Sequence, residues 1–306
     1  MHKHIYRKYL FSTLFIIAFS IGLPAFVTLC FNHSSGGTTY SPVESGKTII
    51  LEDGNSMDVE KFIPCVIAKT LSPKEPEELL KAFAIVTRTD IYKKLNGQSS
   101  IDVSQLNLSY LTYEEMKKQW EDHYAQYRNR LYKAMEQTAL QIITYENTLI
   151  QPEYHQLSCG KTRTGSEKYL TSVECSSDME ASNYLQTSVY SIEAFVSALK
   201  ELNPDLAVST ENPLETFQIT SIDDAGYVTG LQIGNTAVDV SAFANKFSLA
   251  SHCFEVDAYN GGIRLITKGA GSGYGMSLYT AKNMAKNGKS CTDILNFFYA
   301  GTAISH

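Results

Sequence analysis

The chain has 306 residues and a formal net charge of −6, which is enough length for one large domain or two modest ones. It carries no basic tail or block, so its composition argues against a nucleic-acid-binding protein. Tyrosine is frequent, with 19 residues against one tryptophan. Such a count suits a glycan-binding surface, but packing in a core and along strands explains it equally well.

An apolar segment near the N-terminus predicts a membrane anchor. Leu10–Cys30 contains no charged residue and is long enough to cross the about 30 Å hydrocarbon core of a bilayer. Lys3, Arg7 and Lys8 precede it, and this charge bias places the N-terminus in the cytoplasm and the C-terminal part outside. A cleaved signal peptide is the alternative, although no small-x-small site closes the segment well. We therefore expect residues 1–31 to form a cytoplasmic stub and a single-pass anchor in the cell membrane.

A tether and one extracytoplasmic domain should follow the anchor. Asn32–Lys47 is rich in glycine, serine and threonine, which is typical of a flexible linker. The domain should then occupy residues 48–306. It begins with an apolar strand at Thr48–Leu51 and a turn at Asp53–Asn55.

The next segments predict buried helical structure. Val59–Ala68 is largely apolar and could be a strand or a buried helix, because its periodicity does not decide. Pro76 suits the first turn of a second helix, and Asn96 with Gly97 suits its end. Apolar residues surround that helix nearly completely, so it should be buried. Arg88 lies on it and therefore needs an acidic or carbonyl partner.

Helices and strands are intermixed through the rest of the chain. Thr112 and Glu115 have capping-box spacing, and apolar residues then recur at steps of three or four as far as Met135, which predicts one long amphipathic helix. The expected strands are Leu140–Tyr145, Leu149–Leu157, Thr187–Tyr190, Phe217–Ile222, Leu231–Ile233 and Ala237–Val240. Further helices are expected at Ile192–Lys200, Ser277–Asn287 and Thr292–Tyr299. The absence of a βαβ rhythm indicates an α+β domain.

Three segments carry motifs of one family. Val59–Asp90 contains VEKFIPCVIAKTL and EELLKAFAIVTRTD, and Tyr154–Asn183 contains YHQLSCGKT and YLTSVECSSD. Gly271–Thr302 reads GSGYGMSLYTAKNMAKNGKSCTDILNFFYAGT. Over about Thr48–Thr302 the chain resembles the stage II sporulation protein D / amidase-enhancer family. The resemblance implies a relation to lytic transglycosylases, which cleave the glycan strands of peptidoglycan.

The resemblance also implies that the catalytic acid is missing. The family pattern reads roughly LEEYLVGVLAAEM, and its acid falls on Thr70 when the pattern is laid on Val59–Leu71 without gaps. Arg88 corresponds to the arginine of the family's ARTY-like motif and is the other expected catalytic residue. A lytic transglycosylase needs at least one glutamate with a raised pKa to protonate the leaving oxygen, and a threonine hydroxyl cannot replace it.

The other two segments supply the expected substrate contacts. In the last one GSGYGMSLYTA stands where the family has GHGVGMSQYGA, so Ser272 replaces a histidine and Leu278 a glutamine. Glycines there would let the backbone approach a ligand or a strand closely. The residues that the resemblance places at the substrate are His155, Ser158, Gly160, Thr162, Ser272, Gly273, Gly275, Met276 and Ser277.

Six cysteines allow several arrangements. Cys30 belongs to the anchor, which leaves an odd number outside, so at least one is free or paired between chains. Cys159 and Cys175 both lie near polar turns, and a disulfide between them is the leading interpretation. A zinc site formed by His155, Cys159 and Cys175 is an alternative that lacks a fourth ligand; free thiols are the third. No other cofactor is expected.

Three functions remain open from the sequence. The first is a membrane-anchored sporulation protein that binds peptidoglycan glycan strands, or holds a cell-wall amidase and membrane partners during engulfment, without cleaving glycan. The second is an active lytic transglycosylase with a relocated acid, for which the candidates are Glu60, Glu75, Glu146 and Glu153. Such an acid should lie within about 5 Å of Arg88, in a groove lined by Ser158–Thr162 and Gly271–Ser277. The third is an adaptor that does not use the groove.

Overall fold

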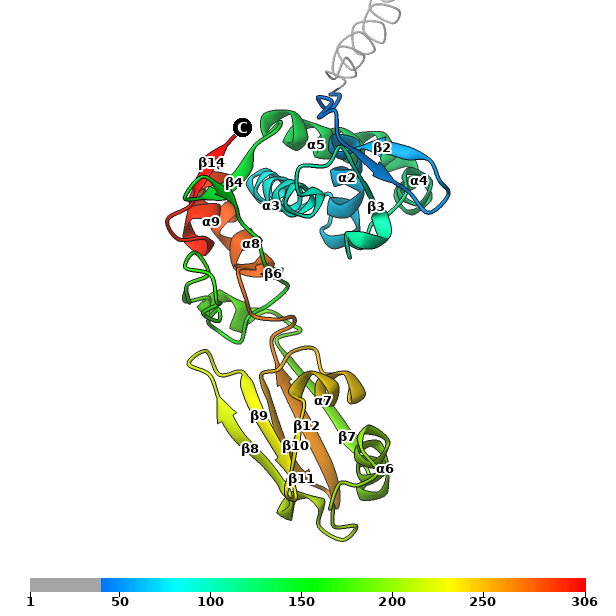
Figure 1. Ribbon diagram of the computed structural model, residues 1–306, viewed down its shortest axis with the longest axis vertical. Coiled ribbons are helices and arrows are strands. Elements are labelled where there is room, and N and C mark those ends of the chain that lie inside the picture. Colours follow the sequence, from blue (N-terminus) through cyan, green and yellow to red (C-terminus); the bar gives the residue numbers. More distant parts are fainter. Residues whose placement is uncertain (1–39) are drawn as a thin grey trace, which may run out of the picture. The chain divides into compact units, whose positions relative to one another are not determined.

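The computed structural model describes residues 40–306, which form a mixed α+β fold (Figure 1). The predicted fold class is thus confirmed. The α-helices are α2 (Val59–Thr70), α3 (Glu77–Leu95), α4 (Tyr113–Trp120), α5 (Tyr124–Gln137), α6 (Ile192–Leu202), α7 (Val240–Lys246), α8 (Leu278–Lys286) and α9 (Cys291–Phe298).

Most strands are short and group into small sheets. The strands are β1 (Thr48–Ile50), β2 (Ser56–Asp58), β3 (Ser100–Asp102), β4 (Ile142–Tyr145), β5 (Thr148–Leu149), β6 (Tyr154–His155), β7 (Leu185–Tyr190), β8 (Phe217–Ile222), β9 (Val228–Ile233), β10 (Thr236–Val238), β11 (Phe254–Tyr259), β12 (Gly262–Lys268), β13 (Met276–Ser277) and β14 (Ala303–Ser305). The sheet orders are β2-β1-β3, β10-β9-β8, β11-β12-β7, β13-β6 and β14-β4-β5.

Helix α3 is the centre of the first hydrophobic core. It contacts α2, α5, α8 and α9, and nearly every residue from Leu79 to Ile91 is buried. An apolar surface on all sides requires neighbours on all sides, and the chain supplies them from both ends of the domain (Figure 1). Val59–Ala68, which the sequence left undecided, is helical as part of α2, with Asp58 as its N-cap.

The long amphipathic helix predicted from Thr112 to Met135 is interrupted. The capping box at Thr112 and Glu115 is present, but α4 ends at Trp120, and Glu121 has a φ of 46°. A short 3₁₀ turn then leads into α5. The break lets α4 pack on α2 while α5 also reaches α3. Apolar residues recur at helical spacing on both sides of the break, because α4 and α5 each bury an apolar face.

A second hydrophobic core lies within residues 185–268. Sheet residues from β9, β11 and β12 pack there against α6 and α7. The β11–β12 hairpin was not predicted, although Asn260 and Gly261 form its two-residue loop with φ values of 49° and 75°. An Asn-Gly pair between apolar runs is a strong hairpin signal, because both positions need positive φ.

The predicted strand Leu149–Leu157 is two short strands, β5 and β6, instead of one. Pro152 lies between them and has no N–H to donate to a ladder. β5 pairs with β4, whereas β6 pairs in parallel with β13 from the C-terminal motif. The interruption therefore sends the chain from one sheet to another.

The N-terminal predictions fall largely outside the described residues. The expected anchor at residues 10–30 lies there, and so do residues 32–39 of the expected linker. Residues 45–47, the last part of that linker, are tied to the domain, because Ser45 and Gly46 donate hydrogen bonds to the Asp58 carboxylate. Within residues 40–306, no helix has the length and apolar character needed to span a bilayer.

Candidate functional site

Thr70 lines a cavity at the end of α2. The cavity has a volume of about 300 Å³. The cavity is lined by Thr70, Leu71, Ser72, Glu75, Leu79, Gln156, Leu157, Asn183, Ala270, Leu278, Tyr279 and Lys282. Segments from all three motif regions thus meet where the resemblance expects the acid.

Glu75 is the one carboxylate that lines this cavity. Its Oε1 accepts a hydrogen bond from Lys282 Nζ at 2.8 Å, and its side chain is 15% exposed. The Glu75 backbone carbonyl accepts from Arg130. Arg130 of α5 thus holds the Glu75 backbone, and Lys282 of α8 holds its side chain. The cavity therefore contains an ion pair.

The structure corrects the catalytic role predicted for Arg88. Its side chain is fully buried, and Nε and Nη2 donate to the two oxygens of Glu60 at 2.5 and 2.7 Å. Nη1 donates to the Gln141 carbonyl at 3.1 Å. The prediction that Arg88 requires an acidic or carbonyl partner is confirmed, and both are present. Because neither side chain reaches a surface, Arg88 cannot touch a substrate and Glu60 cannot act on one.

The other two carboxylates considered as relocated acids lie elsewhere. Glu146 is in the β4–β5 turn with a φ of 49° and lines a different cavity, together with Lys93 and Lys168. Burial and the charge of Asp90 raise the pKa of Glu153, but Glu153 does not line the Thr70 cavity. Of the four candidates, only Glu75 lines the Thr70 cavity.

Most residues predicted to contact substrate are buried instead. His155, Ser158, Thr162, Met276 and Ser277 are at most 3% exposed, so their side chains have no surface to offer a glycan. Gly160, also buried, accepts a hydrogen bond from Cys175 N. Ser272 is the exception, because it is exposed.

Asp178 explains why Ser158 and Ser277 are buried. The Asp178 carboxylate accepts hydrogen bonds from Ser158 N at 2.7 Å, Ser277 Oγ at 2.7 Å and Thr280 Oγ1 at 2.7 Å. Ser277 also caps α8. The polar positions of two motifs therefore satisfy one buried carboxylate, as buried charges require. Asp178 is the aspartate that closes the YLTSVECSSD motif, but no local pattern predicts it as the acceptor for residues of two motifs.

Two glycines of the last motif are needed for backbone contact with the protein itself. A Cβ on Gly273 would lie 2.4 Å from the Tyr227 ring, and one on Gly275 would lie 2.0 Å from the Glu153 carbonyl. Their φ values of 80° and 66° also favour glycine. The close approach predicted for these glycines is therefore present, with neighbouring segments and not a ligand as the partner.

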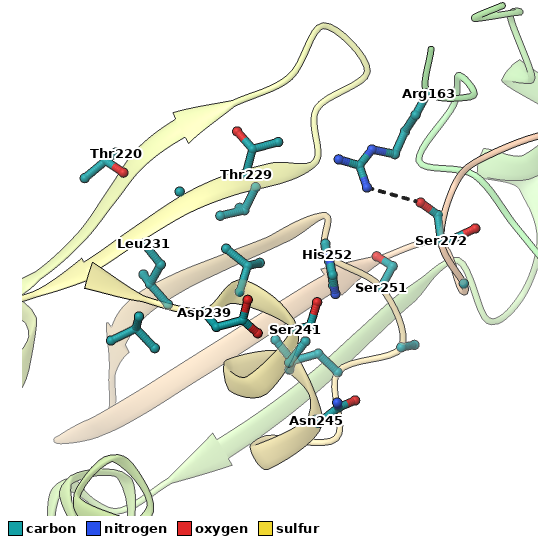
Figure 2. A pocket seen from close by; sticks show the side chains of 18 of the residues that line it. Arg163, Thr220, Thr229, Leu231, Asp239, Ser241, Asn245, Ser251, His252 and Ser272 are labelled. Carbon is teal, nitrogen blue, oxygen red and sulfur yellow. Dashed lines mark hydrogen bonds between the residues drawn. The ribbon is translucent and has the colours of Figure 1, made fainter. Parts of the chain in front are cut away.

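A larger cavity lies beside Ser272. It has a volume of about 770 Å³. Figure 2 shows Arg163 and Ser272 joined by a hydrogen bond at its edge, with Asp239, Asn245 and His252 also lining it. The mixture of hydroxyl, amide, imidazole and charged groups suits a polar ligand. No sequence pattern predicts this group, because its members come from well-separated segments.

Arg163 is held rigidly at this cavity. Its Nε donates to Asp223 Oδ2 at 2.6 Å, and its guanidinium lies over the rings of Tyr227 and Tyr274 at 5.0 and 4.5 Å from their centroids. Burial and the Arg163 charge lower the pKa of His252. A cation fixed between two rings keeps its position without the entropy cost of a free side chain.

Comparisons with known proteins agree with these motifs. The family described as Stage II sporulation protein matches residues 50–145. Stage II sporulation protein D of Bacillus amyloliquefaciens is 30% identical over 264 residues, which cover 82% of this chain and 75% of the relative. The chain belongs to the stage II sporulation protein D family.

Two further relatives support this assignment. Stage II sporulation protein D of Bacillus subtilis is 28% identical over 264 residues, again covering 82% of this chain and 75% of the relative. An uncharacterized protein of Brachyspira hyodysenteriae is 26% identical over 260 residues, which cover 82% of this chain and 67% of that protein. The family match at residues 50–145 includes both Thr70 and Arg88.

The cysteines of this family member are not arranged as expected. The predicted Cys159–Cys175 disulfide is not formed, because both thiols are free. Cys175 is buried, whereas the Cys159 thiol donates to the Ala225 carbonyl at 2.8 Å. The zinc alternative also finds no support: within residues 40–306 no group of three or more His, Cys, Asp or Glu side chains could hold a metal ion.

His155 should make the stability of this family member depend on pH. A carbonyl only accepts hydrogen bonds, so the contact between His155 Nδ1 and the Tyr274 carbonyl at 2.9 Å places the proton of the neutral ring on Nδ1. Nε2 is buried without a partner among the described residues. Burial lowers the pKa of His155 below its ordinary 6.5. The unfolded chain therefore binds this proton at a pH where the folded protein does not.

We expect the free energy of unfolding to decrease as the pH falls below about 6.5, by at most about 1.4 kcal/mol per pH unit from this group. Urea denaturation at about pH 7.5 and about pH 5.5 measures the change. His155→Asn keeps a donor for Tyr274 but does not titrate there, so its loss between the two pH values should be smaller than that of the wild type. Equal losses would show that His155 is not the source.

Proposed function

We propose that this protein acts at the cell envelope during sporulation, where it binds glycan strands of peptidoglycan without cleaving them. Its N-terminal segment, residues 10–30, would anchor it in the cell membrane, with the domain on the outer side. A cell-wall amidase and membrane partners of engulfment are the partners that the family context suggests. The observation that carries the proposal is that Thr70, which the resemblance places at the position of the family's acid, lines a cavity with polar groups around it.

The chemistry supports loss of cleavage. Protonation of the glycosidic oxygen requires a group that exchanges its proton near neutral pH, and general acid catalysis typically contributes about 10²–10⁴-fold. Thr70 cannot supply such a proton. Glu75 lies in the same cavity, but its Oε1 is already paired with Lys282 Nζ at 2.8 Å.

The polar lining of the cavity supports glycan binding. Ser72, Gln156, Asn183 and Tyr279 line it with hydroxyl and amide groups, which are the donors and acceptors that sugar hydroxyls require. Lys282 adds a cation, although its charge is already matched by Glu75. Polar groups placed around a concave surface provide orientation for a ligand. An adaptor that does not use the cavity would have no need to keep this lining.

Replacing Thr70 by glutamate tests the proposal directly. Residues 40–306 are incubated with purified glycan strands freed of stem peptides, and anhydro-sugar ends are measured by mass spectrometry. We expect no product from the wild type, retained binding in a co-sedimentation assay, and product from Thr70→Glu at about 10²–10⁴ times the wild-type background. Thr70→Gln is the matched control, because it has nearly the same size but cannot donate an acidic proton.

Two other outcomes would contradict the proposal. Anhydro ends from the wild type would favour an active transglycosylase, the second candidate function, which rests on the presence of Glu75 in the Thr70 cavity. If Glu75→Gln then formed no anhydro ends while Glu146→Gln still did, Glu75 would be identified as the acid. A wild-type protein that neither cleaves nor binds glycan would instead favour a partner-binding adaptor.

A further inference from the structure

Two thiols from distant parts of the sequence meet beside Gly226. A Cβ built on Gly226 would lie 3.6 Å from Cys159 Sγ and 3.9 Å from Cys253 Sγ, so both sulfur atoms border the same small space. The Cys159 thiol donates to the Ala225 carbonyl at 2.8 Å. Cys159 follows β6, whereas Cys253 immediately precedes β11. Their proximity is thus a product of the tertiary fold.

The backbone on both sides of this thiol pair is held in place. Cys159 N donates to the Tyr227 hydroxyl at 3.2 Å, and its carbonyl accepts from the Tyr184 hydroxyl at 3.1 Å. Cys253 N donates to Ser251 Oγ at 3.0 Å. Disulfides form only between cysteines that the fold already holds close together. The fixed backbone therefore favours a bond at this pair over bonds to the other cysteines.

The two thiols differ in reactivity. The neighbouring Cys253 thiol lowers the pKa of Cys159, against the opposing effect of burial. The same contact, followed by burial, raises the pKa of Cys253. Cys159 is partly exposed, whereas Cys253 is only 7% exposed. The thiolate is the nucleophile in thiol chemistry, so Cys159 is the group that an external reagent would meet first.

We propose that Cys159 and Cys253 are a redox-active pair that forms a reversible disulfide by exchange with an external disulfide. The Cys159 thiolate attacks one sulfur of the external disulfide, which forms a mixed disulfide and releases one thiolate. Cys253 then loses its proton and attacks Cys159 Sγ, which releases the second thiolate. Two protein thiols are oxidised and one external disulfide is reduced to two thiols.

The bond would tie the loop after β6 covalently to the sheet of the second core. Cys159 belongs to the loop that follows β6, and Cys253 leads into the β7–β12–β11 sheet. The ion pair of Arg163 with Asp223 already links the loop after β6 to the turn between β8 and β9 without a covalent bond. A disulfide that closes a long loop restricts the unfolded chain strongly. Oxidation should therefore stabilise the protein, independently of whether it binds glycan.

Peptide mapping of the full chain tests the proposal without any substitution. The protein is equilibrated with mixtures of glutathione disulfide and glutathione, free thiols are alkylated, and the digest is analysed by mass spectrometry. We expect a cross-linked peptide that contains Cys159 and Cys253, and its loss after treatment with dithiothreitol. Two thiols that stay alkylatable in glutathione disulfide alone would overturn the proposal, and so would a glutathione adduct that persists on Cys159 or a dominant Cys159–Cys175 bond.

The melting temperature provides a second measurement. Oxidation should raise it by about 5–15 °C, as estimated for a bridge across a long loop in a domain of this size. Cys159→Ser and Cys253→Ser should each abolish the rise. Cys291→Ser, which removes a partly exposed thiol elsewhere, should respond as the wild type does. An equal rise in all three variants would refute the assignment.

Discussion

Arg88→Met is expected to lower the free energy of unfolding by about 3–5 kcal/mol, because it leaves a buried carboxylate without its partner. Glu60 is 1% exposed and lies within α2, so water cannot replace the guanidinium. The Gln141 carbonyl would lose its donor as well. Guanidinium denaturation of residues 40–306 measures the change.

A control variant separates the effect of breaking the buried ion pair from the effect of removing one positive charge. Lys118→Met removes an exposed positive charge on α4 and should change the free energy of unfolding by less than about 0.5 kcal/mol. The double variant Glu60→Leu with Arg88→Met should be more stable than Arg88→Met alone, because no unpaired charge remains. A loss below about 1 kcal/mol in Arg88→Met would contradict a structural role and reopen a direct role at the substrate.

Asp178→Ala is expected to cost a similar amount, about 3–5 kcal/mol. Hydrogen bonds to a charged group each contribute about 1.5–3 kcal/mol, although such contributions are not additive. The substitution leaves Ser158 N, Ser277 Oγ and Thr280 Oγ1 without their common acceptor. Chemical denaturation again measures the loss. Asp178→Asn, which keeps one acceptor oxygen, should be intermediate.

Asp178→Ala should also weaken glycan binding at the Thr70 cavity. Ser277 caps α8, and α8 carries Tyr279 and Lys282, which line that cavity. If α8 becomes looser, glycan binding should weaken under conditions where the domain is still folded. Asp122→Ala, at an exposed position, is the matched control and should change neither quantity. Unchanged stability in Asp178→Ala would show that the three donors find other partners.

Local features of the fold were readable from the sequence. Residue periodicity reports burial, so the apolar surround of α3 and the need of Arg88 for a partner followed directly. The N-cap at Thr112 was predicted because capping depends on residues only a few positions apart. The same locality applies to the motif around Thr70, since the family's acid is recognised by its neighbours in sequence.

Contacts between distant residues needed the tertiary structure. Glu60 as the partner of Arg88 and Asp178 as the common acceptor of two motifs depend on how helices pack, which no local pattern specifies. The same is true of Cys253, which lies beside Cys159 although a pairing with Cys175 was expected from sequence. Burial also changed the interpretation of His155, since a polar residue in a motif can satisfy the protein's own groups instead of a ligand.

The sequence by itself therefore determined the family and the α+β class. The tertiary structure decided which carboxylate lies near Thr70, which motif residues face solvent and which thiols meet. The physical reason is that helix caps, turns and amphipathic faces arise from neighbouring residues. Hydrogen-bond partners and cavities arise instead from the packing of elements that are far apart along the chain.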